Sequence, residues 1–445
     1  MRRRAISSFL IGLVVAVAFC LGSALERQPG GDYRARREAL AKRADGVVLL
    51  FAPIEGPDSV YAFRQDDNFY YLSGLTIPGA ALLVATAADA SRDSPARAYT
   101  EILFLPPRNL RQEKYTGPQL GADDPDAPRI TGFDRVEALD KLPQEVSRML
   151  AGARPAIYAE MGSHEESWST AGPLAFLERT NAEVVFQDVE PMLAALRTVK
   201  DAGEIALIRK AVDASVSAHF AAMKAVKPGV TEYEISALMQ HEWGRRGCER
   251  PAYSPIVGAG HNSTVLHYSE DANTMKSGDV VVIDAAGEYS MYAADITRTL
   301  PVSGHFTARQ REIYDIVLGA QEAAEAAFRS GKSTLTGDSE ASLYKIAKDY
   351  IRSHGKDLHG QPLDQYFVHG LGHYIGLNVH DAGDYKVPLG PGVTFTIEPG
   401  IYIPEENIGV RIEDDYLVGQ DGKLIKLSGA LPSKAEDVEK AMAGR

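Results

Sequence analysis

Residues 280–300 read VVVIDAAGEYSMYAADITRTL, and this stretch decides the fold of the second half of the chain. It holds two short, largely β-branched runs, and each run predicts a buried or half-buried strand. Asp284 ends the first run and Asp295 precedes the second. A carboxylate inside such a strand is costly unless it is paired or binds a metal ion. We therefore predict an antiparallel pair of strands that carries two acidic side chains to a cation site.

The same arrangement recurs further along the chain. Glu398 follows the run 393–397, and Glu413 follows the short run 410–412. The two stretches that begin at Asp284 and Glu398 share a pattern: the acidic residue is followed by a glycine and then a tyrosine, and a second acidic residue, Asp295 or Glu413, comes after the turn. Spacing alone leaves open which of the consecutive acidic residues 413–415 faces inward. The repeat predicts two similar hairpins with two carboxylates each.

A histidine segment, residues 369–381, lies between the two units. It contains His369, His373 and His380 among several glycines. The spacing of the first two matches a helical zinc motif, but no glutamate follows His369 and the glycines disfavour a helix. Four carboxylates and a histidine are too many ligands for one tetrahedral zinc ion, and they suit two divalent cations about 3.5 Å apart that activate a water for hydrolysis. The alternative is a set of solvent-facing strand-end acids beside structural, hydrogen-bonded histidines.

The whole chain fits a two-domain globular protein. It has 445 residues, of which 45% are hydrophobic and 24% charged, and this length exceeds a single typical domain. Acidic residues outnumber basic ones, 60 to 47, and no basic stripe follows the extreme N-terminus, which argues against nucleic acid as a partner. We predict an α/β domain at 25–190, an α+β domain at 197–430 and a C-terminal tail at 431–445.

Local patterns predict the elements of both domains. Residues 25–33 read as an exposed linker and 117–128 as a long loop, and the first domain has no metal-ligand spacing, which predicts a non-catalytic role. The predicted strands of that domain are 46–51, 81–86 and 102–105, and its predicted helix is 133–150. The predicted helices of the second domain are 204–226, one opening at Thr231 with a capping-box spacing, 306–328 and 343–354.

The N-terminus reads as a targeting segment. Arg2, Arg3 and Arg4 precede an apolar stretch at 9–21 and the small residues 22–24, a pattern typical of a cleaved signal peptide. We expect residues 1–24 to be removed and the protein to be exported, either periplasmic or secreted; the alternative is an uncleaved membrane anchor. Cys248 would then have no internal disulfide partner, and its polar surroundings predict a surface or interface thiol.

These motifs together resemble the pita-bread metallopeptidases, and among them the Xaa-Pro aminopeptidases (aminopeptidase P) and the related prolidases. The resemblance covers nearly all of the chain after residue 24. Methionine aminopeptidases lack the first domain, and creatinases lack the metal ligands. The stretches that carry the resemblance are 63–74, 282–287, 294–299, 369–381, 397–400 and 411–414.

The resemblance implies a dinuclear-metal exopeptidase with a pita-bread catalytic domain after an α/β domain. The two ions would be manganese, with zinc and cobalt as alternatives; Asp295 and Glu413 would bridge them, Asp284 would bind one, and His373 and Glu398 the other. The implied metal ligands are Asp284, Asp295, His373, Glu398 and Glu413. The implied catalytic residues are His267, His369, His380, Glu398 as general base, and Arg411. Asn378 departs from the family, whose members often have aspartate there.

The expected substrates are peptides with proline in the second position. We also expect a homo-oligomer, and contact with a membrane only if the N-terminal segment is not cleaved. Three alternatives stay open: an Xaa-Pro dipeptidase, another metal hydrolase such as an amidase or phosphoesterase, and a non-catalytic binding module. The absence of a basic phosphate cradle weighs against phosphate esters.

Overall fold

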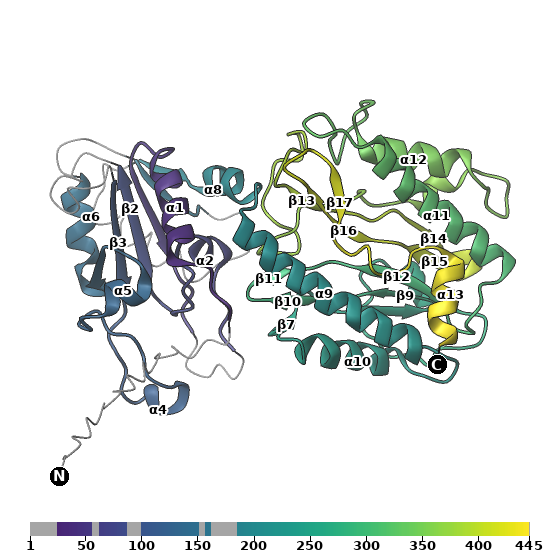
Figure 1. The fold of residues 1–445 in the computed structure, drawn as a ribbon, viewed down its shortest axis with the longest axis horizontal. Helices are drawn as coiled ribbons and strands as arrows, with labels where there is room; N and C mark the ends of the chain where they lie inside the picture. Colours follow the sequence, from purple (N-terminus) through teal and green to yellow (C-terminus); the bar gives the residue numbers. More distant parts are fainter. Residues whose placement is uncertain (1–24, 56–61, 87–98, 151–155, 162–184, 445) are drawn as a thin grey trace, which may run out of the picture.

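The computed structural model describes residues 25–55, 62–86, 99–150, 156–161 and 185–444 (Figure 1). They form two domains side by side, and helix α8 (Glu190–Arg197) leads the chain from the first to the second. The predicted signal segment, residues 1–24, lies outside the described residues. Within the described ranges, no helix has both the length and the apolar character needed to cross a membrane.

The first domain is built on a six-stranded mixed sheet in the order β4-β3-β2-β1-β5-β6. The central strand β2 pairs antiparallel with both β1 and β3, and the outer pairs β3–β4, β1–β5 and β5–β6 are parallel. The strands are β1 (Val47–Phe51), β2 (Ala81–Thr86), β3 (Tyr99–Leu105), β4 (Arg135–Ala138), β5 (Ile157–Ala159) and β6 (Phe186–Asp188). The three predicted strands of this domain are therefore confirmed.

Helices cover both faces of this sheet because its central strands are apolar on both sides. Val48 and Leu50 pack on one face in a cluster with Leu40 of α1 (Gly30–Ala41). The alternate residues of β1 pack on the opposite face against α6 (Leu142–Leu150). The described part of this domain also contains three short helices: α2 (Asp67–Ser73), α4 (Glu113–Thr116) and α5 (Ala127–Thr131).

Two expectations for this domain are wrong in part. The predicted helix 133–150 begins as strand β4 and a 3₁₀ turn at Leu139–Lys141, and only α6 is helical. The reason is that residues 135–138 pair with the free edge of β3, and this pairing overrides helical spacing. The predicted linker 25–33 already contains the start of α1, in which Tyr33 is buried.

The second domain contains two related antiparallel units. One is the sheet β12-β9-β8 and the other is β13-β16-β17. An isolated bridge between Thr297 and Glu413 joins the two units. Their strands are β8 (Ile256–Ala259), β9 (Val280–Asp284), β12 (Thr297–Pro301), β13 (Thr394–Ile397), β16 (Asp414–Val418) and β17 (Leu424–Lys426). Smaller pairings add β7 (Arg250–Pro251), β10 (Gly287–Tyr289), β11 (Tyr292–Ala293), β14 (Gly400–Ile403) and β15 (Ile408–Arg411).

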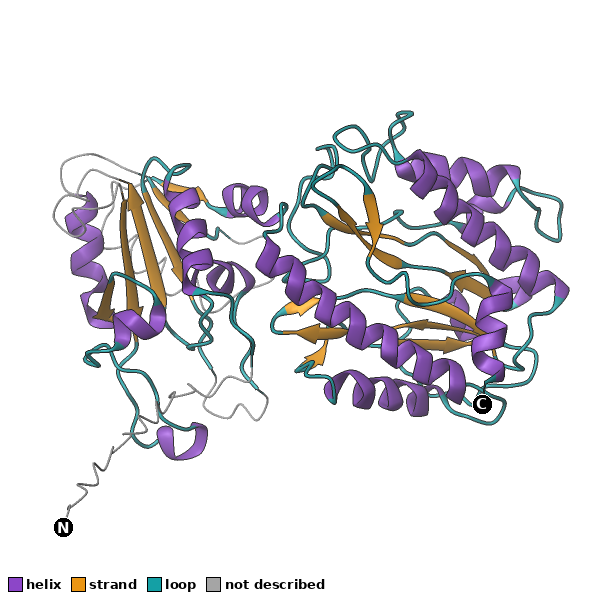
Figure 2. Ribbon diagram, viewed as in Figure 1, coloured by secondary structure: helices purple, strands orange, loops and turns teal. Residues whose placement is uncertain are grey.

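Helices run along the outside of these strands (Figure 2). Helix α9 (Ala202–Ala225) packs on β10 and β11, α10 (Glu232–Gly244) on β8, and α11 (Ala308–Ala327) on β14 and β15, while α12 (Leu343–Ser353) packs on α11. All four predicted helices of this domain are confirmed. Capping boxes open three of them, α9, α10 and α11. The predicted C-terminal tail is wrong, because residues 435–443 form α13 (Ala435–Ala443), whose Val438 and Met442 are buried against the domain.

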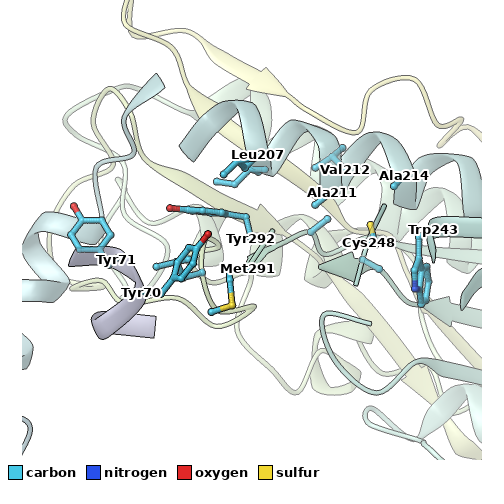
Figure 3. Packing of buried hydrophobic residues seen from close by; sticks show 14 of the residues in the cluster. Tyr70, Tyr71, Leu207, Ala211, Val212, Ala214, Trp243, Cys248, Met291 and Tyr292 are labelled. Atoms are coloured by element: carbon cyan, nitrogen blue, oxygen red, sulfur yellow. The ribbon is translucent and has the colours of Figure 1, made fainter. Parts of the chain in front are cut away.

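One apolar cluster runs through both domains. Figure 3 shows Tyr70 and Tyr71 of α2 beside Met291, Tyr292 and Leu207 of the second domain. Because interior packing is dense, α2 is held at a fixed place relative to the second domain.

The same cluster corrects the expectation for Cys248. The thiol is buried against Trp243 and Gly287 rather than at the surface (Figure 3). Its backbone N–H donates to the Trp243 carbonyl, which folds the polar stretch back under β10. Burial, and then the nearby Glu249 and Glu288, raises the pKa of the Cys248 thiol to about 12, so it is an inert core residue.

Candidate metal centre

Three ligand-type side chains meet between the two hairpin units. Nitrogen or oxygen atoms of Asp295, His373 and Glu413 all lie within 4.8 Å of one another, and all three residues are buried. Asp295 precedes β12, Glu413 precedes β16, and His373 comes from the histidine segment. The two hairpins thus face each other across the cluster, as the sequence repeat predicted.

The other two predicted ligands adjoin this triad. Glu398, directly after β13, places Oε1 3.4 Å from His373 Nε2, which is 3.3 Å from Asp295 Oδ2. Asp284, at the end of β9, is linked to Asp295 by the Tyr253 hydroxyl, which lies 2.6 Å from an oxygen of each carboxylate. Asp284 also accepts a 2.6 Å hydrogen bond from Arg411. The structure therefore brings together all five predicted ligands.

The fold selects Glu413 from the three consecutive acids. Thr297 donates from Oγ1 to Glu413 Oε2 at 2.6 Å, which turns that side chain toward the cluster. Asp414 points the opposite way into a fully buried pair with Arg298, whose guanidinium also donates to the Glu413 carbonyl at 2.8 Å. Asp415 accepts the backbone N–H of Asp295 at 3.1 Å. The period-two alternation of a strand turns Asp414 away from Glu413 and Asp415. The contact of Asp415 with the Asp295 N–H then leaves Glu413 as the candidate ligand.

The electrostatics of the cluster call for added positive charge. Burial, and then Asp284, raises the pKa of Asp295. Burial, and then Asp295 and Glu398, raises the pKa of Glu413 well above its usual range. Burial raises the pKa of Glu398 to about 7 against the opposing effect of His373. These carboxylates cannot all ionise together by themselves, and a set of carboxylates with one imidazole is a donor set that divalent cations accept. The residues therefore fit divalent metal ions.

His373 is the residue on which a cation would replace a proton. Burial alone would lower its pKa, but the adjacent Asp295 and Glu398 outweigh this effect and raise the pKa to about 9. Its Nδ1 lies 3.0 Å from the Tyr374 carbonyl, which fixes the ring and leaves Nε2 facing the carboxylates. A carbonyl partner of this kind orients metal-ligating histidines in general.

The predicted catalytic residues surround the ligands. His369 Nε2 lies 2.8 Å from the Tyr402 hydroxyl, which also accepts a 2.7 Å hydrogen bond from Arg411. The His380 ring stands edge-on to the His373 ring, with centroids 4.3 Å apart. His267 is exposed, and its charge lowers the pKa of both His369 and His380. The four predicted catalytic residues therefore lie around the ligand cluster: His267, His369, His380 and Arg411. The side of the cluster on which the exposed His267 and His380 lie is called its mouth below.

Desolvation and neighbouring positive charge keep His369 and His380 neutral. Burial, and then Arg411, lowers the pKa of His369 to about 4. Partial desolvation, and then His373 and His267, lowers the pKa of His380 to about 4. Both rings can therefore donate or accept hydrogen bonds near neutral pH without carrying a charge.

Sequence reasoning missed Tyr253. It lies in a short irregular segment, residues 252–255, between β7 and β8, where no periodic pattern marks this half-buried side chain. Tyr402 was visible only as the tyrosine of the repeated acidic–glycine–tyrosine pattern. Its contacts with His369 and Arg411 need the pairing of β14 with β15, which spacing did not reveal.

Comparisons with known proteins agree with this geometry. Residues 206–420 match Metallopeptidase family M24, and residues 33–158 match the Aminopeptidase P, N-terminal domain. The chain is 35% identical to Xaa-Pro aminopeptidase of Escherichia coli (strain K12) over 92% of this chain and 97% of that one.

Solved structures give the same result. Proline aminopeptidase P II from Yersinia pestis superposes with a TM-score of 0.81 at 33% identity, covering 94% of this chain and 100% of that one. A Zn-substituted E. coli aminopeptidase P in complex with product superposes with a TM-score of 0.80 at 32% identity, covering 94% and 99%.

Proposed function

Because this chain belongs to metallopeptidase family M24, we propose that two divalent cations are bound by five side chains: Asp284, Asp295, His373, Glu398 and Glu413. The chain is a metallo-aminopeptidase that releases the N-terminal residue from peptides with proline in second position. In this proposal both cations are manganese in the native enzyme. The carboxylate-rich donor set around one imidazole supports manganese over a tetrahedral zinc site. When bound, the cations lower the pKa of a water molecule and polarise the substrate carbonyl.

Glu398 is the general base in this proposal. Its side chain is 16% exposed, against 8% for Asp295 and 2% for Glu413, so it reaches a water at the mouth while the other two stay inside. It takes the proton of the attacking water and can return it to the departing nitrogen. That return is needed because an amide nitrogen, here that of proline, leaves as an amine only after it is protonated.

Histidines at the mouth would stabilise the charge that develops on the carbonyl oxygen. His267 and His380 are both placed for this role, and single substitutions will separate them. Arg411 holds Asp284 and Tyr402 and so keeps the floor of the site rigid. The fixed φ of proline lets a rigid site select that residue by shape.

The meeting of Asp295, His373 and Glu413 at one point carries the proposal. A peptide panel of the form Xaa-Pro-Yaa, Xaa-Pro and Xaa-Ala-Yaa, assayed with manganese, zinc and cobalt in turn, tests it. We expect cleavage of Xaa-Pro-Yaa, highest with manganese, and loss of cleavage in Glu398→Ala and Asp284→Ala. Full activity of either variant at saturating metal would refute the assignment, and preference for Xaa-Pro alone would favour a dipeptidase.

We also propose that the enzyme is exported after removal of residues 1–24 and that it forms a homo-oligomer. The basic, apolar and small-residue order of that segment supports export. N-terminal sequencing of protein from a periplasmic or culture fraction should begin near residue 25; an intact N-terminus in a membrane fraction would favour the anchor instead. Light scattering of the mature protein should give a multiple of the chain mass, and a monomer would refute the oligomer.

A further inference from the structure

We propose that the amino-terminal domain positions His380 through a polar link across the domain boundary, with Asp67 and Asn378 as its two contact residues. The proposal rests on the role given above to His380. The sequence predicts a non-catalytic role for the first domain. The proposal gives that domain a direct influence on the kcat of the enzyme. The link has two arms, and both start at the N-terminus of α2.

The first arm passes through Asn378. Its Nδ2 donates to Asp67 Oδ2 at 3.2 Å, and its Oδ1 accepts the backbone N–H of His380 at 3.1 Å. One side chain therefore spans the distance from the first domain to the backbone of the active-site histidine. Because Asn378 uses both ends of its amide, its orientation is fixed by what Asp67 accepts.

The second arm passes through Arg197 to Asp381, the residue after His380. Arg197 donates to Asp67 Oδ2 at 3.3 Å, to Asn68 Oδ1 at 2.7 Å and to Asp381 Oδ1. Lys200 donates to Asp381 Oδ2 at 2.7 Å. Asp381 is 1% exposed and Arg197 5%, so this arm is shielded from water and salt.

Asp67 is itself held firmly. Arg64 donates to Asp67 Oδ1 at 2.8 Å and to the Leu377 carbonyl at 2.7 Å. This contact attaches Asp67 and the N-terminus of α2, here called the corner, to the loop at residues 376–381 that contains His380. Tyr70 and Tyr71 of the same helix are embedded in the shared apolar core (Figure 3). The corner is therefore a fixed reference point for the loop.

The loop needs such a reference. Residues 376–381 form no helix or strand, and the His380 side chain is exposed, so its ring has little packing of its own to hold it. Its working position, edge-on to His373, is set by the backbone on either side of it. We infer that Asn378 fixes the residue's N–H and Asp381 fixes its carboxyl side.

A charge test follows from the contact between Asp67 and Asn378. Asn378→Asp places two carboxylates within hydrogen-bond distance and removes the donor, so we expect kcat for an Xaa-Pro-Yaa peptide to fall about fivefold. Asp67→Asn added to that variant removes the repulsion and places an amide donor opposite the new carboxylate, but this amide also faces Arg197, which donates to Oδ2 in the wild type. We therefore expect kcat to recover only part of the loss, by about twofold. KM and metal content should change little in both proteins. Tm should change little in Asn378→Asp, because Asn378 is exposed, and should fall in the double variant, which weakens the contacts of Asp67 with Arg64 and Arg197.

The route through His380 is tested in a His380→Ala background. There Asn378→Asp should lower kcat no further. Glu26→Gln is the matched control, since it removes the charge from another contact between the N-terminal segment and the second domain, to Lys210 and Tyr289, away from the loop; it should leave kcat unchanged.

Three results would overturn the inference: wild-type kcat in Asn378→Asp, no recovery in the double variant, or an equal loss in the His380→Ala background. Full activity of His380→Ala by itself has a different meaning, because it would remove the role proposed for His380 and not the link.

Discussion

Removal of the Tyr253 hydroxyl tests whether the buried carboxylates form one metal centre. The hydroxyl lies 2.6 Å from Asp284 and 2.6 Å from Asp295. Burial, and then the two carboxylates, raises its pKa well above the usual range, so it stays a neutral donor at every assay pH. Tyr253→Phe leaves the ring in place and removes only the donor that holds these carboxylates in position.

The size of the effect follows from the contacts. A hydrogen bond to a charged group contributes about 1.5–3 kcal/mol. Loss of such a partner behind a metal ligand lowers metal affinity or activity roughly 10- to 100-fold, which corresponds to about 1.4–2.8 kcal/mol. The two ranges agree, and we expect manganese affinity in Tyr253→Phe to fall by that factor while the fold is retained.

Calorimetric titration of the metal-free protein with manganese measures the affinity, and circular dichroism checks the fold. Tyr314→Phe is the matched control, because it removes a buried hydroxyl that donates to the Ser433 carbonyl outside the site. It should lower Tm slightly and leave manganese binding unchanged. Equal manganese affinity in wild type and Tyr253→Phe would refute the reasoning that Asp284 and Asp295 belong to one centre.

Three further outcomes are expected. Removal of metal with a chelator should abolish peptide hydrolysis and lower Tm, since the buried carboxylates regain their mutual repulsion; activity that survives exhaustive dialysis, followed on the same peptide, contradicts a metal centre. Burial, and then Asp66, raises the pKa of Glu160 to about 8, against 4.5 in the unfolded chain. The wild type therefore loses stability as pH rises from about 4.5 to about 8. The Tm advantage of Glu160→Gln should grow over that window, and parallel Tm curves would oppose this. A Cβ at Gly376 would lie 2.2 Å from Asp381 Oδ2, whereas one at Gly370 meets nothing within 4 Å. Gly376→Ala should thus cost about 1–3 kcal/mol in urea unfolding and Gly370→Ala much less, and equal costs would count against the crowding.

The cluster of candidate ligands could be predicted because a metal site requires acidic residues in strands that are otherwise apolar. An acidic residue at the end of a β-branched run, such as Asp284, has no ordinary reason to be buried, and its repetition at Glu398 points to a shared site. Helices α9 and α10 were predictable for a similar reason, since their capping boxes and apolar spacing are local signals.

Other features depend on contacts that the sequence does not encode locally. Residues 135–138 became a strand because β3 offered an edge, and Cys248 became buried because its polar neighbours fold back under β10. The role of Tyr253 depends on two strands meeting behind it. Asn378, visible in the sequence only as a departure from the family, gained meaning when Asp67 of the other domain was found opposite it.

The bridge between Thr297 and Glu413 makes the metal centre a seam between two separately built halves. Each half supplies two carboxylates, so neither has a complete set of ligands until the seam closes. The rate of manganese binding during refolding would therefore report the rate at which the two halves join. We expect this binding to be slower than the recovery of the helical circular dichroism signal. A folding intermediate in which both halves are formed but not yet joined would have most of its secondary structure and would not bind the ion.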